Sequence, residues 1–94
     1  MNKTELVDEL ARRADLPKTE ATRAVDALFG TDGIIVSTLR GGAKIQIIGF
    51  GSFQAKQRAA RTGRDPRSGN PIQIKASLQP TFKAGQGFKD ALNP

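Results

Sequence analysis

Residues 58–69 read RAARTGRDPRSG, and this stretch spaces its arginines by three residues around a single proline, Pro66. Such a spacing suits a helix, but Gly63, Pro66 and Gly69 oppose one, because a glycine costs about 1 kcal/mol and a proline about 3 kcal/mol in a helix interior. An extended ribbon with a turn at its tip fits better. Strand side chains alternate between two faces, so arginines three residues apart point to opposite faces. A ribbon charged on both faces cannot bury either face, and we expect it to bind a polyanion such as the groove of DNA.

The chain has 94 residues, which predicts one domain with too small a core to make a monomer comfortably stable. It contains no cysteine and no histidine, so disulfides and zinc sites of the Cys/His type are excluded. Oligomerisation is therefore the expected supplement. The isoleucines at 45, 47 and 48 indicate that the phenylalanines near them belong to a core. We assign Phe50, Phe53 and Phe82 to the core of a dimer.

The formal net charge of +6 is unevenly distributed. Residues 1–39 hold five basic and seven acidic residues, a balance of −2, whereas residues 40–94 hold ten basic and two acidic residues, a balance of +8. A basic half joined to a mildly acidic half predicts a directed polyanion-binding surface.

Several other classes of function find no support in the sequence. There is no apolar run of about 18 residues for a membrane span, and the N-terminus lacks the apolar segment of a signal peptide. Without histidine or cysteine the serines have no evident base, and the only acids of the basic half are Asp65 and Asp90. We expect no enzymatic activity, no cofactor, no metal and no small-molecule ligand.

Two short helices with a tight turn are predicted at the start of the chain. Asn2 and Glu5 have the spacing of a capping box, and Pro17 suits the start of the second helix. The apolar face of the first helix is predicted to hold Leu6, Val7, Leu10, Ala11 and Ala14. The apolar face of the second is predicted to hold Ala21, Ala24, Val25, Leu28 and Phe29.

The segment Gly30-Thr31-Asp32-Gly33 interrupts the second helix. At 100° per residue the apolar residues 35, 36 and 39 return to the face that Val25 and Leu28 occupy, which favours one continuous helix to about Leu39. The two glycines and Asp32 argue for a break. We expect a continuous helix that is kinked or loosened here and ends at Gly41-Gly42.

Beyond Gly42 the apolar period changes to two. Residues 44–47 alternate, residues 49–53 turn into a second strand, and residues 72–75 alternate again, while residues 65–70 have the composition of a turn. These patterns predict an α+β fold: a helical hairpin as base, a three-stranded antiparallel sheet extended into a β-ribbon arm, and a short C-terminal helix.

We expect residues 1–94 to form one domain with three segments. The helical hairpin takes residues 1–41, the sheet residues 42–81 with the arm at about 55–76, and the C-terminal helix residues 82–94.

Four segments carry a resemblance to a known family: MNKTEL at 1–6, GFGSF at 49–53, RAARTGRDP at 58–66 and PTFKAG at 80–85. In this order they resemble the bacterial HU family of histone-like DNA-binding proteins, which includes integration host factor. The resemblance implies an intertwined dimer with a helical base and two β-ribbon arms that lie in the minor groove of DNA. It also implies a proline at each tip that wedges between base pairs, and by position this proline is Pro66.

The expected function is therefore architectural: largely sequence-independent binding and bending of double-stranded DNA by a cytoplasmic, nucleoid-associated homodimer that prefers bent, nicked or flexible duplexes. The resemblance places the arm arginines at 58, 61 and 64 and body contacts at Lys3 and Lys83. The full predicted contact set is Lys3, Lys56, Arg58, Arg61, Arg64, Pro66, Arg67, Lys75 and Lys83.

The chain departs from the family pattern at four places. Gly30-Thr31-Asp32-Gly33 contains about three extra residues, and Ser68 replaces a common threonine. Asp65 stands beside the tip proline where asparagine is common, and its carboxylate is expected to repel phosphate. Gln86 stands where many members carry lysine, which predicts a weaker grip on flanking DNA.

Three alternatives stay open at this point. A sequence-preferring protein of the integration host factor type shares the predicted fold. Basic composition alone also allows an RNA-binding or ribosome-associated module. Finally, a purely structural dimer could carry its charge for solubility.

Overall fold

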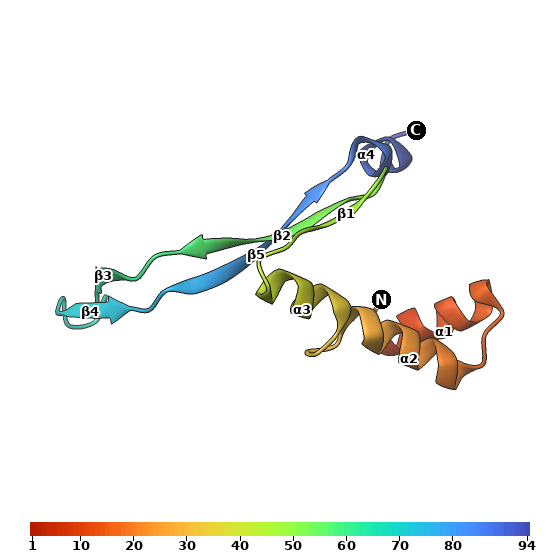
Figure 1. Ribbon diagram of the computed structural model, residues 1–94, viewed down its shortest axis with the longest axis horizontal. Helices are drawn as coiled ribbons and strands as arrows, with labels where there is room; N and C mark the ends of the chain where they lie inside the picture. Colours follow the sequence, from red (N-terminus) through yellow and green to blue (C-terminus); the bar gives the residue numbers. More distant parts are fainter. The chain divides into compact units, whose positions relative to one another are not determined.

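The computed structural model describes all 94 residues, which form two compact units, residues 1–38 and 39–94 (Figure 1). The first unit is helical, and the second is a long β-structure that ends in a short helix. The expectation that residues 1–94 form one domain stays a prediction.

The helical unit begins with α1 (Lys3–Ala14) and α2 (Lys18–Phe29). The predicted cap of α1 is confirmed, because the Asn2 side-chain oxygen accepts a hydrogen bond from the backbone N–H of Glu5 at 2.8 Å. Asp15 ends α1 in the left-handed conformation with φ 54°, and α2 begins directly after Pro17, as expected.

A small apolar core joins the two helices of this hairpin. Val7 of α1 packs with Ala21 and Val25 of α2, and Leu10 and Ala11 lie against them half-buried. The outer members of the predicted apolar faces remain exposed in the single chain: Leu6, Leu28 and Phe29. The hairpin therefore uses only the inner part of its apolar surface for its own core.

The expected continuous second helix is wrong: α2 ends at Phe29, and a separate helix, α3 (Ile34–Arg40), follows a tight turn. At Gly30 the backbone becomes extended, with ψ 165°. A side chain at Gly30 would place its Cβ only 2.6 Å from the Asp26 carbonyl oxygen. The apolar face of α2 does continue after the turn. The helix nevertheless breaks at Gly30, because glycine allows an approach of the backbone to Asp26 that a residue with a Cβ does not permit.

We expect the amides of the turn at residues 30–33 to exchange faster than those of the helix that precedes it. The amides of Thr31 and Asp32 donate no backbone hydrogen bond, whereas residues 22–28 lie inside α2. Hydrogen exchange followed by NMR should therefore show faster exchange at residues 31–32 than at residues 22–28. Equal and strong protection in both segments would contradict this expectation.

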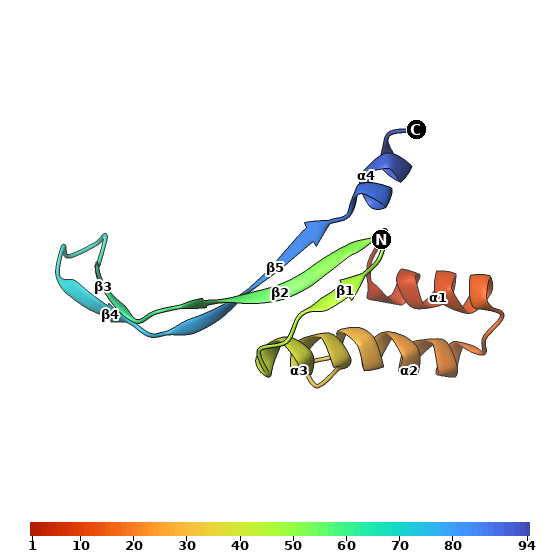
Figure 2. The same cartoon turned by 45° about the horizontal axis from the view of Figure 1, so that its top comes forward.

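The second unit is built on an antiparallel sheet in the order β1-β2-β5 (Figure 2). Its strands are β1 (Ile45–Ile47), β2 (Gly51–Arg58) and β5 (Ser77–Ala84). A second antiparallel pair, β3 (Arg61–Arg64) and β4 (Pro71–Ile74), continues the β2–β5 ribbon toward its tip. The other end of the unit carries α4 (Gln86–Leu92), so the α+β fold with its ribbon arm is confirmed.

Two details of the β-structure correct the sequence prediction. Residues 71–74 belong to the tip pair, and the third strand of the sheet is β5 instead. This strand continues through Phe82 to Ala84 because it pairs along its whole length with β2, so α4 begins at Gln86 and not at residue 82. Local spacing predicted a helix from Phe82, and cross-strand pairing overrides it.

Four phenylalanines pack together in this unit. The ring centroid of Phe82 lies 4.8 Å from that of Phe53 and 5.7 Å from that of Phe50, and Phe50 stacks on Phe88 of α4 at 4.7 Å. Such pairs add about 0.5–1.5 kcal/mol each beyond the burial of their area. The sequence prediction assigned three of these residues to a core and missed Phe88.

The single chain buries very little of its apolar surface. Only four apolar residues are buried, and large side chains stay open, with Phe50 45% exposed, Phe82 42% and Ile48 95%. An aromatic cluster of this size that is nearly half exposed to solvent is typical of a surface that a partner covers.

Candidate nucleic-acid interface

The strand register divides the three-stranded sheet into a polar and an apolar face. Paired residues of antiparallel strands lie on the same face, and alternate residues on opposite faces. The polar face carries Gln46, Ser52, Gln54, Lys56, Arg58, Ser77, Gln79, Thr81 and Lys83. The apolar face carries Ile45, Ile47, Phe53, Ala55, Leu78, Pro80 and Phe82, with Gln57 as its one polar residue. Three of the predicted contact residues, Lys56, Arg58 and Lys83, are therefore brought onto one face.

A hollow of about 640 Å³ lies where the pairing between the sheet and the tip pair is interrupted. Its lining includes Arg58 at the end of β2, Arg61 at the start of β3 and Lys75 between β4 and β5, together with Ala59, Ala60 and Gln79. The Arg58 Nε donates to the Gln79 side-chain oxygen at 2.8 Å, which holds that guanidinium over the ribbon. The structure thus gathers three predicted contacts around one cationic depression.

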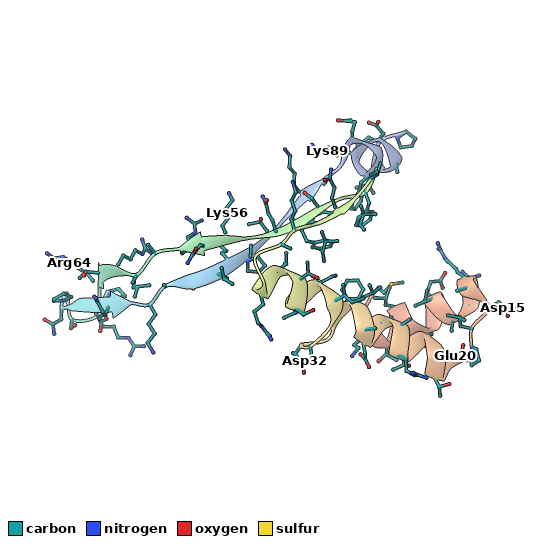
Figure 3. All side chains as sticks on the ribbon, viewed as in Figure 1. Asp15, Glu20, Asp32, Lys56, Arg64 and Lys89 are labelled. Carbon is teal, nitrogen blue, oxygen red and sulfur yellow. The ribbon has the colours of Figure 1, made fainter.

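Beyond this hollow the arginines separate to the two faces of the ribbon, as predicted. Arg61 pairs with Ile74, and Arg64 pairs with Pro71, so the two arginines lie an odd number of residues apart and on opposite faces. Both side chains are exposed. Arg64 and Lys56 project away from the ribbon in Figure 3.

The tip of the ribbon is a compact turn between Arg64 and Pro71. The Asp65 backbone N–H donates to the Asn70 carbonyl at 2.8 Å, and the Gly69 N–H donates to the Asp65 carbonyl at 2.7 Å. Pro66 and Arg67 lie exposed at the outer end of this turn. The apolar proline ring is thus presented to solvent between charged neighbours.

The cations of the two units differ in how they are neutralised. All four ion pairs of the structure lie in the helical unit, and they engage Lys3, Arg12, Arg13 and Lys18. Lys3 is one of the predicted contacts, and its Nζ lies 2.6 Å from an oxygen of Asp26. None of the ten basic residues at positions 40–94 pairs with a carboxylate.

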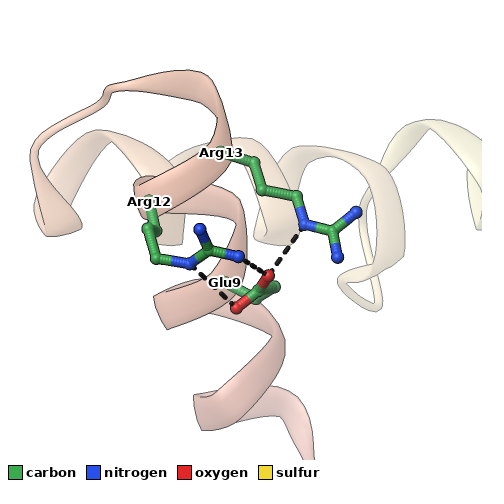
Figure 4. A network of polar contacts seen from close by, with 3 residues as sticks. All are labelled: Glu9, Arg12 and Arg13. Atoms are coloured by element: carbon green, nitrogen blue, oxygen red, sulfur yellow. Dashed lines mark hydrogen bonds and ion pairs between the residues drawn. The ribbon is translucent and has the colours of Figure 1, made fainter.

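Glu9 illustrates the pairing in the helical unit (Figure 4). Hydrogen bonds from Arg12 and then from Arg13, whose Nε lies 2.7 Å from the carboxylate, lower the pKa of Glu9 from 4.5 to about 2. The contribution of this pairing to stability is therefore fully present above pH 4.5 and is lost as the pH falls through about 2. Because the group is exposed, water and salt screen the contribution.

A second polar hollow, of about 460 Å³, lies on the polar face beside Lys83. It adds residues that the sequence prediction missed: Lys44, Gln46, Ser52 and Gln54. The alternation of residues 44–47 could have identified them, because it places Lys44 and Gln46 on the face opposite to Ile45 and Ile47. Gln86, which was singled out as a departure, does not line it; its amide donates to Asp90 at 2.8 Å within α4.

Comparison with known proteins finds similarity over nearly the full length of the chain. Residues 1–93 match the family described as Bacterial DNA-binding protein. DNA-binding protein HU-beta of Pseudomonas aeruginosa is 48% identical over 93 residues, which cover 99% of this chain and 100% of that protein. DNA-binding protein HU of Staphylococcus aureus is 51% identical over 92 residues, which cover 98% of this chain and 99% of that protein.

A solved structure shares the fold. The Anabaena HU–DNA cocrystal structure superposes with a TM-score of 0.82 at 37% sequence identity, covering 100% of this chain and 99% of that one. The likeness extends from the helical hairpin to the ribbon and the last helix, because the whole chain is covered.

Proposed function

The chain belongs to the bacterial DNA-binding protein family, and from this premise we propose that two copies of it form an architectural protein that binds and bends double-stranded DNA with little sequence preference. It is not an enzyme. A protein that binds the bacterial chromosome works where the chromosome lies, so the proposal places it in the cytoplasm in association with the nucleoid. None of its four helices combines the length and apolar character needed to cross a bilayer.

The observation that carries this proposal is the unneutralised charge of the ribbon unit. Ten cations and two carboxylates share residues 40–94, and no ion pair forms among them. Close cations without counterions repel each other, and a row of phosphates relieves that repulsion while releasing the condensed ions of the DNA. In the helical unit four of the five cations are paired with carboxylates, so that unit has no comparable excess of free positive charge.

The ribbon also has the shape for a groove. It is two strands wide and presents cations on both faces near its tip, through Arg61 and Arg64. In the minor groove A·T and T·A pairs offer the same acceptors, so contacts there read little sequence. Preference then comes from the energy of deformation, which is lower for nicked, mismatched or flexible DNA.

The contact residues are proposed as a set. Arg58, Arg61 and Lys75 around the hollow bind backbone phosphates, and Arg64 and Arg67 hold the tip. Lys56 and Lys83 bind phosphates on the polar face of the sheet. Lys3 joins the set when DNA phosphate competes with Asp26 for its ammonium group. Pro66 is the apolar group that enters a base step.

The homodimer is part of the proposal. A chain that buries four apolar residues and leaves Phe50 and Phe82 nearly half exposed gains most of its core from a partner, and a second copy presents the same apolar face. Two copies then supply two ribbons, and both are needed to hold a bend.

Replacing Arg61 by alanine is expected to make binding less sensitive to salt for every DNA sequence. If about 6 phosphates are neutralised, log K falls against log salt with a slope of about −5, and each lost contact reduces it by about 0.9. Because a dimer carries two copies of Arg61, the slope should become shallower by about 2. Fluorescence anisotropy at several salt concentrations measures it.

Lys89→Ala provides the matched control for that measurement. Lys89 is an unpaired cation of the same unit, but it lies on α4 and outside the proposed contact set. Its loss should leave the slope within about 0.5 of the parent value. An unchanged slope for Arg61→Ala removes Arg61 from the contacts.

Four measurements separate the proposed function from its alternatives. Tighter binding to nicked and four-way-junction DNA than to intact duplex is expected, and equal affinities argue against bending. Competition of duplex DNA with structured RNA at fixed salt should favour DNA; the reverse supports an RNA-binding module. Selection from random duplexes should return no motif, whereas a clear motif supports the integration host factor type. A solubility dimer predicts no DNA binding at about 0.1 M salt.

A further inference from the structure

Asp65 has a structural part in the tip turn that its charge alone does not suggest. One carboxylate oxygen accepts the backbone N–H of Arg67 at 2.8 Å. This is an Asx turn, in which a side chain replaces a backbone carbonyl as acceptor two residues along the chain. The backbone of the same residue makes two further bonds, to Asn70 and Gly69.

These three bonds set the position of Pro66 from both sides. Proline has no N–H with which to anchor itself, so its ring is placed by residues 65 and 67. Asp65 is tied through its N–H, its carbonyl and its carboxylate, and Arg67 is tied through its N–H to that carboxylate. The other side-chain bonds of the turn are longer: the Asn70 N–H donates to the Ser68 hydroxyl at 3.3 Å, and the Arg64 guanidinium donates to the Gly69 carbonyl at 3.5 Å.

Burial agrees with this assignment. Asp65 is half-buried, while every other residue from Arg64 to Asn70 is exposed. A carboxylate that served only as a surface charge would not be the most enclosed side chain of the tip.

We propose that Asp65 is the positioning residue of the tip, whose carboxylate closes the turn through the Arg67 N–H and so aims the Pro66 ring at a base step. The inference rests on the proposed function for its second half, the aim at DNA. It separates two effects of the carboxylate: as a hydrogen-bond acceptor it organises the turn, and as a charge it repels phosphate.

Two uncharged replacements isolate the acceptor from the charge. Asp65→Asn keeps a side-chain oxygen that can accept from the Arg67 N–H, whereas Asp65→Ala removes it, and both remove the negative charge equally. Any difference between the two variants therefore reports the hydrogen bond. The tip lies outside the aromatic cluster and the helical core, so both variants should keep the fold, which circular dichroism verifies.

The first readout needs no DNA. In the full-length dimer, hydrogen exchange of the Arg67 amide should be the same within about twofold for Asp65→Asn and the parent, and about fivefold to tenfold faster for Asp65→Ala. Ser68→Ala, which removes the other side-chain acceptor of the turn, should leave the Arg67 amide unchanged. Equal exchange in Asp65→Ala and Asp65→Asn overturns the positioning role.

The second readout is the bend of a nicked duplex labelled at both ends, measured by energy transfer. Asp65→Asn should bind about threefold to tenfold more tightly than the parent, because phosphate repulsion is relieved, and should bend the duplex as fully. Asp65→Ala lacks the acceptor, so it should bend the duplex less and, because a less bent duplex makes fewer contacts, bind it less tightly than Asp65→Asn does. A full bend with Asp65→Ala overturns the aim at the base step.

The two readouts also separate the failure of this inference from that of the proposed function. If the parent protein bends no duplex, the proposed function fails, while the exchange experiment still decides whether Asp65 closes the turn. If the parent bends DNA and the two variants bend it equally, the function stands and the inference falls.

Discussion

Replacement of Pro66 by alanine is expected to abolish most of the DNA bend while leaving weak, salt-sensitive binding. The proline ring is the only rigid apolar group at the outer end of the tip, where Arg64 and Arg67 flank it. Unstacking a base step costs a few kcal/mol, which the additional contacts of a bent duplex offset. Without the ring no step is opened, and the arginines bind straight duplex through its phosphates alone.

Energy transfer across a doubly labelled duplex measures this loss directly. The same variant should also lose its preference for nicked or mismatched DNA, because that preference arises from the cost of bending. Pro80→Ala is the matched control: it is the same substitution on the apolar face of the sheet, paired with Ala55 and distant in sequence from the tip. A full bend with Pro66→Ala would reduce Pro66 to a turn residue.

Loss of the Phe82 ring is expected to have the largest effect on stability. Phe82 makes aromatic pairs with Phe50, Phe53 and Phe88, and it is the member that touches all the others. A buried Phe→Ala change costs about 3–5 kcal/mol, a large part of the 5–15 kcal/mol that stabilises an ordinary domain. In a dimer each copy suffers this loss, so Phe82→Ala should be largely dissociated and unfolded at micromolar concentration.

Sedimentation velocity and thermal melting test this expectation. The parent should sediment as a dimer at micromolar concentration, and its melting temperature should rise with protein concentration, because folding and association are coupled. Ile72→Ala is the control, since Ile72 is a similarly exposed apolar residue of the tip pair outside the aromatic cluster. A folded parent monomer at micromolar concentration would disprove the obligate dimer.

Much of the ribbon unit follows from local patterns in the sequence. Glycine and proline at residues 63, 66 and 69 exclude a helix, and the strict alternation of residues 44–47 predicts a strand, because backbone sterics and side-chain period act within a few residues. The same holds for the cap at Asn2 and the start of α2 after Pro17. The excess of cations at residues 40–94 predicts a polyanion as partner without any coordinates.

Other features were decided by backbone contacts that the sequence pattern does not display, one of them local and the others between residues distant in the chain. The apolar phase across residues 30–33 favoured a continuous helix, but backbone contact between Gly30 and Asp26 decides for a break. The extension of β5 to Ala84 depends on its pairing with β2, and only this register places Lys56, Arg58 and Lys83 on one face.

The tip turn shows most clearly which features follow from residue types and which depend on the folded chain. A turn at residues 65–70 follows from the residue types alone, since proline, glycine and asparagine restrict the backbone locally. The sequence presented Asp65 only as a charge, because a residue type states what a side chain can do and not which partner it meets. In the folded turn the Arg67 backbone nitrogen lies 2.8 Å from that carboxylate. The carboxylate therefore has a second role beside its charge, as the hydrogen-bond acceptor that holds the tip together.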